Sequence, residues 1–205
     1  MFRYDVTMRL LMLLLLTTAA HANDWRAPTW LRGEVGRAWL NGWTHIDPGH
    51  EQRVWGNGPQ FGLALGTRFT DSFGAKWLAS WAWSDDLTYN TGPQAGSLST
   101  SGFGVGATVW LPAHLMIEVD LMLASGTLEG IDARPDSEST TSFAPCVRVG
   151  YDLALAPEVS FALLAGVQWF NASDDIEPVT STDHLIVTIS LALDVFLSGA
   201  TPAAK

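Results

Sequence analysis

The segment Leu115-Met116-Ile117-Glu118-Val119-Asp120-Leu121-Met122-Leu123 alternates with a period of two residues. Every odd-numbered position is Leu, Ile or Val, whereas the even positions include two carboxylates. Because successive side chains of a β-strand point to opposite faces, this segment is predicted to be a strand with one wholly apolar face and one charged face. The same phase, with apolar odd-numbered residues, recurs along the rest of the chain.

Eight segments show this alternation and are predicted strands. Each has about ten residues, the length that a tilted strand needs to cross the hydrocarbon of a membrane. The predicted strands cover residues 30–41, 60–69, 75–84, 101–111, 115–123, 142–153, 159–170 and 184–197. Short connections at 70–74, 112–114 and 154–158 alternate with long ones at about 42–59, 85–100, 124–141 and 171–183.

An even number of strands joined by alternating short and long connections is typical of outer-membrane barrels. We therefore predict an all-β fold, an eight-stranded antiparallel up-and-down transmembrane β-barrel. The barrel covers residues 23–197, and residues 198–205 form a short periplasmic tail. Its odd residues face lipid and its charges face inward. An exported soluble barrel or sandwich is the alternative, but its outer face would have to be polar.

The first 22 residues have the pattern of a secretory signal peptide. A basic region is followed by the apolar run Leu10 to Leu16, which is too short to span a membrane, and by the cleavage pattern Ala20-His21-Ala22. We expect residues 1–22 to be removed, so that the mature chain begins at Asn23. An uncleaved anchor helix is the alternative.

Composition excludes several other classes of protein. The formal net charge of −10 argues against nucleic-acid binding, which depends on basic patches. The single cysteine, Cys146, excludes an intramolecular disulfide framework. After the signal sequence, no apolar run reaches the roughly 18 residues of a membrane-spanning helix. Ten Trp, nine Phe and 19 Gly with only 16% charged residues are ordinary for a membrane barrel.

Aromatic residues gather near the two ends of the predicted strands, as expected for belts at the two membrane interfaces. The belt near the long connections consists of Trp39, Phe61, Trp83, Phe103, Phe143 and Trp169, and the belt near the short ones of Phe69, Trp77, Tyr151 and Phe161.

Charged residues occupy the even, inward-facing positions of the strands. They comprise the cations Arg32, Arg68, Lys76 and Arg148 and the acids Glu34, Glu118, Asp120, Asp152 and Asp194. The interior of an eight-stranded barrel is just wide enough to be filled by side chains, and a buried ion without a partner costs several kcal/mol. The favoured interpretation is a packed network of salt bridges and hydrogen bonds that plugs the barrel. An ion path or proton relay is the alternative.

Arg37 breaks the apolar phase and would face lipid. One explanation is that its side chain extends toward lipopolysaccharide phosphates at the outer surface. The other is a β-bulge after Gly36 that shifts the phase of the strand.

The long connections carry possible chemistry at the outer leaflet. His45 and His50, with Ser84 on another connection, could form a lipid-cleaving or acyl-transfer site, although no nucleophile motif is present. Acidic residues in these connections could bind Ca²⁺ or Mg²⁺, but none fits a spaced calcium-loop motif, so a solvated acidic rim is favoured. We expect no metal and no cofactor.

The alternation, the aromatic belts and the strand count resemble the small OmpA-like and OmpX-like bacterial outer-membrane barrels. More loosely, the segment Ser101–Thr108 followed by Ile117–Asp120 resembles strands of autotransporter translocator domains. Phe196, which by phase faces inward, is followed by Leu197 and the tail rather than ending the chain.

These observations favour a non-enzymatic integral outer-membrane barrel with a structural or adhesion-type surface role. A narrow porin-like channel is the second hypothesis, and an outer-leaflet lipid-modifying enzyme is the third. The expected partners are outer-membrane lipid and lipopolysaccharide, with no nucleic acid, and a monomer is expected.

Overall fold

The computed structural model describes residues 29–46, 50–70, 72–89, 92–129, 137–138, 141–156, 158–172 and 179–197. The predicted signal peptide and the predicted tail lie outside these residues. Among the residues described, no helix is long and apolar enough to cross a bilayer.

Nine antiparallel strands and one short 3-10 helix, η2, make up the described chain. They are β1 (Thr29–Ile46), β2 (His50–Thr70), β3 (Phe73–Tyr89), β4 (Gly92–Trp110), η2 (Pro112–His114), β5 (Leu115–Glu129), β6 (Ser137–Glu138), β7 (Ser142–Ala156), β8 (Val159–Ala172) and β9 (Val179–Leu197).

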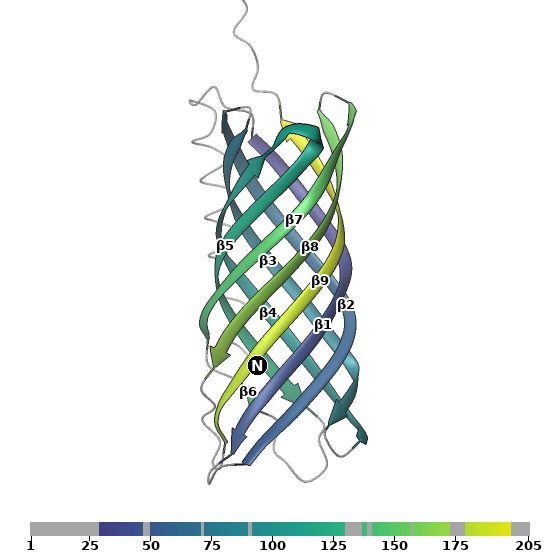
Figure 1. The fold of residues 1–205 in the computed structure, drawn as a ribbon, viewed down its shortest axis with the longest axis vertical. Helices are drawn as coiled ribbons and strands as arrows, with labels where there is room; N and C mark the ends of the chain where they lie inside the picture. The colour runs from purple at the N-terminus through teal and green to yellow at the C-terminus, as the bar shows by residue number, and fades with distance from the viewer. Residues whose placement is uncertain are drawn as a thin grey trace, which may run out of the picture.

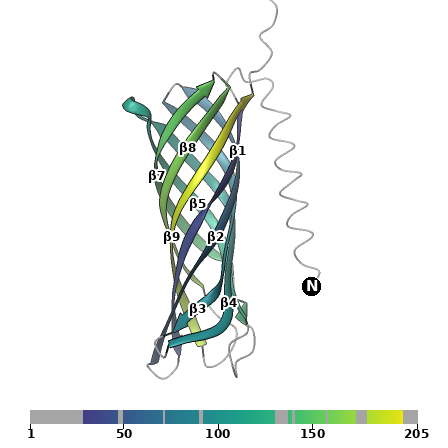
Figure 2. The same cartoon turned by 90° about the vertical axis from the view of Figure 1, so that its right-hand side faces the viewer.

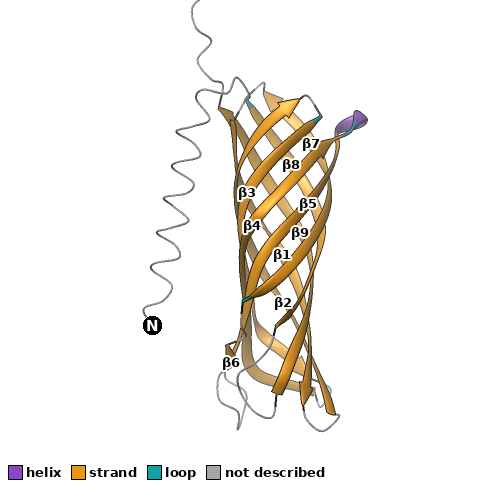
Figure 3. Ribbon diagram, turned by 90° about the vertical axis from the view of Figure 1, so that its left-hand side faces the viewer, coloured by secondary structure: helices purple, strands orange, loops and turns teal. Residues whose placement is uncertain are grey.

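The eight long strands close into a barrel (Figures 1 and 2). Their order around the sheet is β4-β3-β2-β1-β9-β8-β7-β5, and pairing of β4 with β5 completes the ring. The two-residue β6 pairs with β5 at the end of the barrel opposite η2 (Figure 3). We call the end with η2 the short-turn end and the other the long-loop end. This topology confirms the predicted eight-stranded up-and-down barrel.

The two faces of the wall differ as the alternation predicts. On the odd face, Leu63 is 60% exposed and Leu163 is 53% exposed, whereas the even-numbered residues of the same strands, such as Ala64 and Leu164, are buried. A soluble barrel would bury its apolar face, so this outward apolar surface is a lipid-facing surface. The ten predicted belt residues lie on this outward face, with Phe103 and Phe161 half-exposed and the other eight more exposed.

The predicted strand lengths were too short at the long-loop end. Most of the predicted connections 42–59 and 85–100 belong to strands, and β2 alone has 21 residues. Alternation marks only the part of a strand that has lipid on one side. Beyond the lipid, the strands need no apolar face, but cross-strand hydrogen bonds continue to hold them together.

Arg37 lies on the exposed, outward face. The pairing of β1 with β2 and with β9 runs without interruption through Gly36 and Arg37. The suggested bulge after Gly36 is therefore wrong, because the recorded irregularity of β1 lies between His45 and Ile46, far along the strand.

Candidate functional site: the charged lumen

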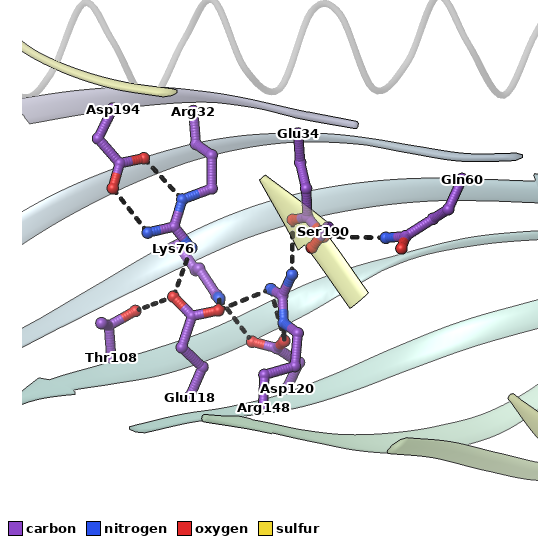
Figure 4. Close-up of polar contacts among 10 residues, drawn as sticks. All are labelled: Arg32, Glu34, Gln60, Lys76, Thr108, Glu118, Asp120, Arg148, Ser190 and Asp194. Carbon is purple, nitrogen blue, oxygen red and sulfur yellow. Dashed lines mark hydrogen bonds and ion pairs between the residues drawn. The ribbon is translucent and has the colours of Figure 1, made fainter. Parts of the chain in front are cut away.

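Ten polar side chains meet inside the barrel (Figure 4). We call this group the lumen cluster. It consists of Arg32 and Glu34 from β1, Gln60 from β2, Lys76 from β3, Thr108 from β4, Glu118 and Asp120 from β5, Arg148 from β7, and Ser190 and Asp194 from β9. Seven of the eight long strands thus contribute a side chain, so the lumen cluster connects almost the whole circumference of the wall.

Glu118 is the centre of the lumen cluster. Its carboxylate lies 2.6 Å from Arg32 Nη1, 2.6 Å from Lys76 Nζ and 2.9 Å from Arg148 Nη2. The Thr108 hydroxyl donates a further hydrogen bond of 3.1 Å to Glu118 Oε1. The side chain has no exposed surface. The single carboxylate of Glu118 on β5 therefore contacts all three cations of the lumen cluster.

Arg148 contacts three carboxylates at once. Its Nη1 donates to Glu34 Oε2 at 2.7 Å, and its Nη2 lies 2.9 Å from oxygens of both Glu118 and Asp120. Its Nε also donates to Asp120 Oδ2 at 3.1 Å. The planar guanidinium, with five N–H donors, suits such a position between several carboxylates.

Arg32 and Asp194 form a bidentate pair across the junction of the first and last strands. Arg32 Nε donates to Asp194 Oδ1 at 2.6 Å, and Arg32 Nη2 donates to Asp194 Oδ2 at 2.7 Å. Their backbones are direct partners in the β1–β9 ladder. This pair is a charge-assisted, two-point contact between residues that are 162 positions apart in the chain.

The charges of the lumen cluster nearly balance. Three cations face four acids, namely Glu34, Glu118, Asp120 and Asp194, and each of these seven side chains is buried. Glu34 supplements its ion pair with hydrogen bonds donated by Gln60 and Ser190. Removing an ion from water costs several kcal/mol, and only close partners and additional hydrogen bonds offset that cost. Every charged member has an ion-pair partner within 2.9 Å, and Glu34 and Glu118 also accept hydrogen bonds from neutral side chains.

Glycines on neighbouring strands make room for the long charged side chains. Gly106 pairs with both Lys76 and Asp120, and a Cβ atom at Gly106 would lie 1.9 Å from Asp120 Oδ1. Gly166 of β8 pairs with Arg148, and a Cβ there would lie 2.5 Å from Arg148 Cγ. The space beside Gly106 and Gly166 is therefore occupied by the side chains of Asp120 and Arg148.

Aromatic rings close the lumen on the short-turn side. Trp30 and Trp110 meet edge to face, with ring centroids 6.4 Å apart. Arg68 lies here, with its guanidinium carbon 4.6 Å from the Trp110 ring centroid and its Nε donating to the Thr70 carbonyl. Asp152 is half-buried on β7. Both had been predicted for the charge network, but neither is among the ten side chains of the lumen cluster.

Mostly apolar side chains fill the lumen on the long-loop side, with the polar Ser84, Thr100, Gln168 and His184 buried among them, and we call the apolar members the apolar layer. It is formed by Ala38, Leu40, Val54, Ala82, Leu87, Leu98, Met122, Ala124, Ala144, Phe170 and Ile186, all buried. The sequence interpretation missed this layer because Val54, Leu87 and Leu98 fall in segments that were predicted to be connections. The signal was present for Val54 and Leu98, which continue the even phase of the adjacent strands. Leu87 is odd-numbered and is buried because the β3–β4 register shifts between Ser84 and Asp86.

The suggested outer-leaflet catalytic site is not supported at Ser84. Its side chain is buried, with 1% of its surface exposed, and its hydroxyl donates to the Asp86 carbonyl of its own strand. The side chains of His45 and His50 lie outside the described part of the structure. Within the described residues, no group of three or more His, Cys, Asp or Glu side chains has a geometry suited to a metal ion.

Solved structures with the same architecture match most of the chain. Neisserial surface protein A (NspA) has a TM-score of 0.55 at 13% identity, over 82% of this chain and 97% of its own. OprG of Pseudomonas aeruginosa has a TM-score of 0.55 at 12% identity, over 84% and 98%. The outer-membrane protein AlkL has a TM-score of 0.55 at 11% identity, over 88% and 94%. The chain has the fold of a small outer-membrane β-barrel.

No protein-family model matches the chain, and no curated protein matches it in sequence. At these identities the structural likeness concerns the fold. Together with the apolar outward face, that fold places the protein in the bacterial outer membrane, with lipid as its immediate partner.

Proposed function

We propose that the protein is a non-enzymatic outer-membrane barrel that is closed to ions and presents rigid β-ribbons at the cell surface. The observation that carries this proposal is the filling of the lumen in three successive layers. These layers are the Trp30–Trp110 pair, the lumen cluster and the apolar layer.

The lumen cluster and the apolar layer oppose the passage of an ion for different physical reasons. In the lumen cluster, an ion would have to displace side chains whose contacts with oppositely charged groups are as short as 2.6 Å. On the long-loop side, an ion would lose its hydration among mostly apolar side chains, and the few polar groups buried there, such as Thr100 and Gln168, would not replace its water shell. Burying an ion in this way costs far more than burying a neutral group. The lumen therefore suits a structural core better than a conducting path.

The long strands support the surface role. β2 has 21 residues and β1 has 18, whereas about ten residues of a tilted strand suffice to cross the hydrocarbon. The additional residues of these strands lie mainly at the long-loop end, beyond Trp39 and the other residues of the aromatic belt near the long connections. Paired strands that project from the lipid form a stiffer surface than loops do, and a stiff surface loses less entropy when it binds a partner.

Planar-bilayer recording of the purified protein tests the closed lumen. We expect no steady current from the wild-type protein. Arg148→Met provides a matched comparison, because it disrupts the lumen cluster and should raise any leak. A steady wild-type current that falls when Arg148 or Asp120 is replaced would instead identify a narrow channel and overturn the proposal.

The surface role has a separate test. Replacing residues 88–93 of the β3–β4 ribbon by Asn-Gly shortens the ribbon, keeps Leu87 of the apolar layer and keeps a tight hairpin turn. We expect cells that display the shortened protein to adhere less to surfaces than cells that display the full chain, at equal amounts in the outer membrane. Equal adherence would remove the β3–β4 ribbon from the proposed surface role.

A further inference from the structure

The exposed cations of the described chain are concentrated on one ribbon. Of its six Lys and Arg residues, Arg32, Lys76 and Arg148 are buried in the lumen cluster, and Arg68 is half-buried at the short-turn end. The two exposed ones, Arg37 and Arg53, both lie on the β1–β2 ribbon. In a chain with a formal net charge of −10, this concentration marks the ribbon as the described surface that is best suited to an anion.

Arg53 is held between two tryptophan rings. Its guanidinium carbon lies 5.1 Å from the Trp43 ring centroid and 5.9 Å from that of Trp55. Trp43 is its direct cross-strand partner on β1, and Trp55 lies two residues further along β2. These cation–π contacts restrict the guanidinium without using its N–H donors, and those donors can bind a phosphate group in a bidentate manner.

Arg37 emerges from a lipid-facing surface and extends toward the outside. Its cross-strand partner on β9 is Ile189. The preceding residue on the same lipid-facing side of β1 is Val35, two residues nearer the short-turn end. Its guanidinium donates to Asn57 Oδ1, and Asn57 pairs with Trp39, two residues nearer the long-loop end. Arginine is costly in the middle of a bilayer and tolerated near its interface, which accounts for this direction.

We propose that Arg37 and Arg53, together with Trp39, Trp43 and Trp55, form a binding site for the phosphate groups of lipopolysaccharide in the outer leaflet. We call these five residues the Arg–Trp patch. Arg37 and Trp39 lie where acyl chains meet headgroups. Arg53 lies on the same face in the row of Trp43, six residues or about 20 Å further out, so the two cations would contact phosphate groups at two levels of the lipopolysaccharide layer. The patch is continuous with the lipid-facing wall, which favours a lipid over a soluble anion.

One carboxylate borders the Arg–Trp patch. Asp183 of β9 pairs with Trp43, in the same cross-strand row as Arg53. Its Oδ1 accepts a hydrogen bond of 2.7 Å from Asn171 Nδ2 on β8. Trp43 lies between Asp183 and Arg53 in this row, so the carboxylate is two strands away from Arg53.

This inference rests on the outer-membrane placement of the barrel, and it is independent of whether the lumen conducts. The test uses the full mature protein, purified in detergent and titrated with lipid A, the phosphorylated anchor of lipopolysaccharide, with bound lipid counted by native mass spectrometry. The variants are Arg37→Gln with Arg53→Gln, Arg37→Lys with Arg53→Lys, and Arg68→Gln as a cation removed elsewhere. Heat-modifiable migration on gels verifies that each variant is folded.

We expect the double Gln variant to bind lipid A about 10-fold or more weakly than the wild type, because charge-assisted hydrogen bonds are lost. Arg68→Gln should bind like the wild type, and the double Lys variant should fall in between. Chemically dephosphorylated lipid A should bind wild type and double Gln variant equally weakly. Bilayer conductance should be the same in wild type and variants, which separates this test from that of the closed lumen.

Two results would overturn the proposal. The first is equal lipid A affinity of the wild type and the double Gln variant. The second is binding of soluble dextran sulfate that depends on Arg37 and Arg53, combined with lipid A binding that does not. That second result would assign the Arg–Trp patch to a soluble sulfated glycan.

Discussion

Replacing Arg148 by methionine should be among the most destabilising single changes in the barrel. The substitution keeps a side chain of similar length, but it removes the cation that contacts Glu34, Glu118 and Asp120. The lumen cluster would then hold two cations and four acids in place of three and four. Glu34 would keep its hydrogen bonds from Gln60 and Ser190 but lose its ion-pair partner. Removing one partner of a buried ion pair costs about 3–5 kcal/mol, and we expect a loss in that range.

Glu118→Gln is the informative comparison. Glu118 contacts three cations, so a simple count of contacts would make its loss the worse one. The charge balance leads to the opposite expectation, because three cations then face three acids and each cation keeps at least one carboxylate. The expected cost is about 1–3 kcal/mol, the range for a buried polar group that loses part of its hydrogen bonding.

Both values can be measured by guanidinium unfolding in phosphatidylcholine vesicles, followed by tryptophan fluorescence. The comparison requires equal dependence of the unfolding free energy on denaturant in all variants. Arg53→Gln, on the exposed face, is a control that should change the unfolding free energy by less than about 1 kcal/mol. If Glu118→Gln were more destabilising than Arg148→Met, the argument from charge balance would be wrong.

Three further expectations concern the wall. Gly106→Val places a side chain where Asp120 Oδ1 already lies and should destabilise the barrel by at least about 1–3 kcal/mol. Gly33→Ala is the control, because no atom lies within 4 Å of its new Cβ, and it should be nearly neutral. Equal unfolding midpoints of the two variants would contradict this expectation. Val147 lies on the exposed face of β7, midway between the aromatic belts, and Val147→Arg should lower the free energy of unfolding in the same vesicles by about 2–4 kcal/mol. A smaller loss in detergent would show that the effect comes from the lipid. Cys146 is buried, so its thiol should react with Ellman's reagent only after unfolding, and rapid labelling of the folded barrel would show that the lumen is open to the reagent.

The transmembrane part of the fold could be predicted because lipid imposes a strong rule on sequence. Each strand of the wall has lipid on one side and a narrow lumen on the other, so its residues alternate, as Leu115 to Leu123 illustrates. The rule ends where the lipid ends. Beyond that level, segments such as 50–59 carry no outward apolar phase although they are strands, and the prediction stopped too early.

The sequence could predict which charged residues face the lumen, but not which cation pairs with which acid. Phase alone brings Arg32, Lys76 and Arg148 to the inside. Which acid each one meets depends on the relative shift of neighbouring strands around the barrel, and this shift is not written in any single strand. Arg68 also has the inward phase, but it lies near the short-turn end, where its guanidinium carbon is 4.6 Å from the Trp110 ring centroid.

The Arg32–Asp194 pair joins the two ends of the barrel chain. Until β1 and β9 come together, neither residue can reach the other, and a half-inserted sheet would leave both ions next to acyl chains. An incomplete barrel is thus destabilised in two ways, by the unpaired hydrogen-bonding groups at its strand edges and by charged side chains without partners. Insertion and ring closure should consequently occur as a single cooperative event, with the last hairpin docking onto the first strand before the membrane seals around either one.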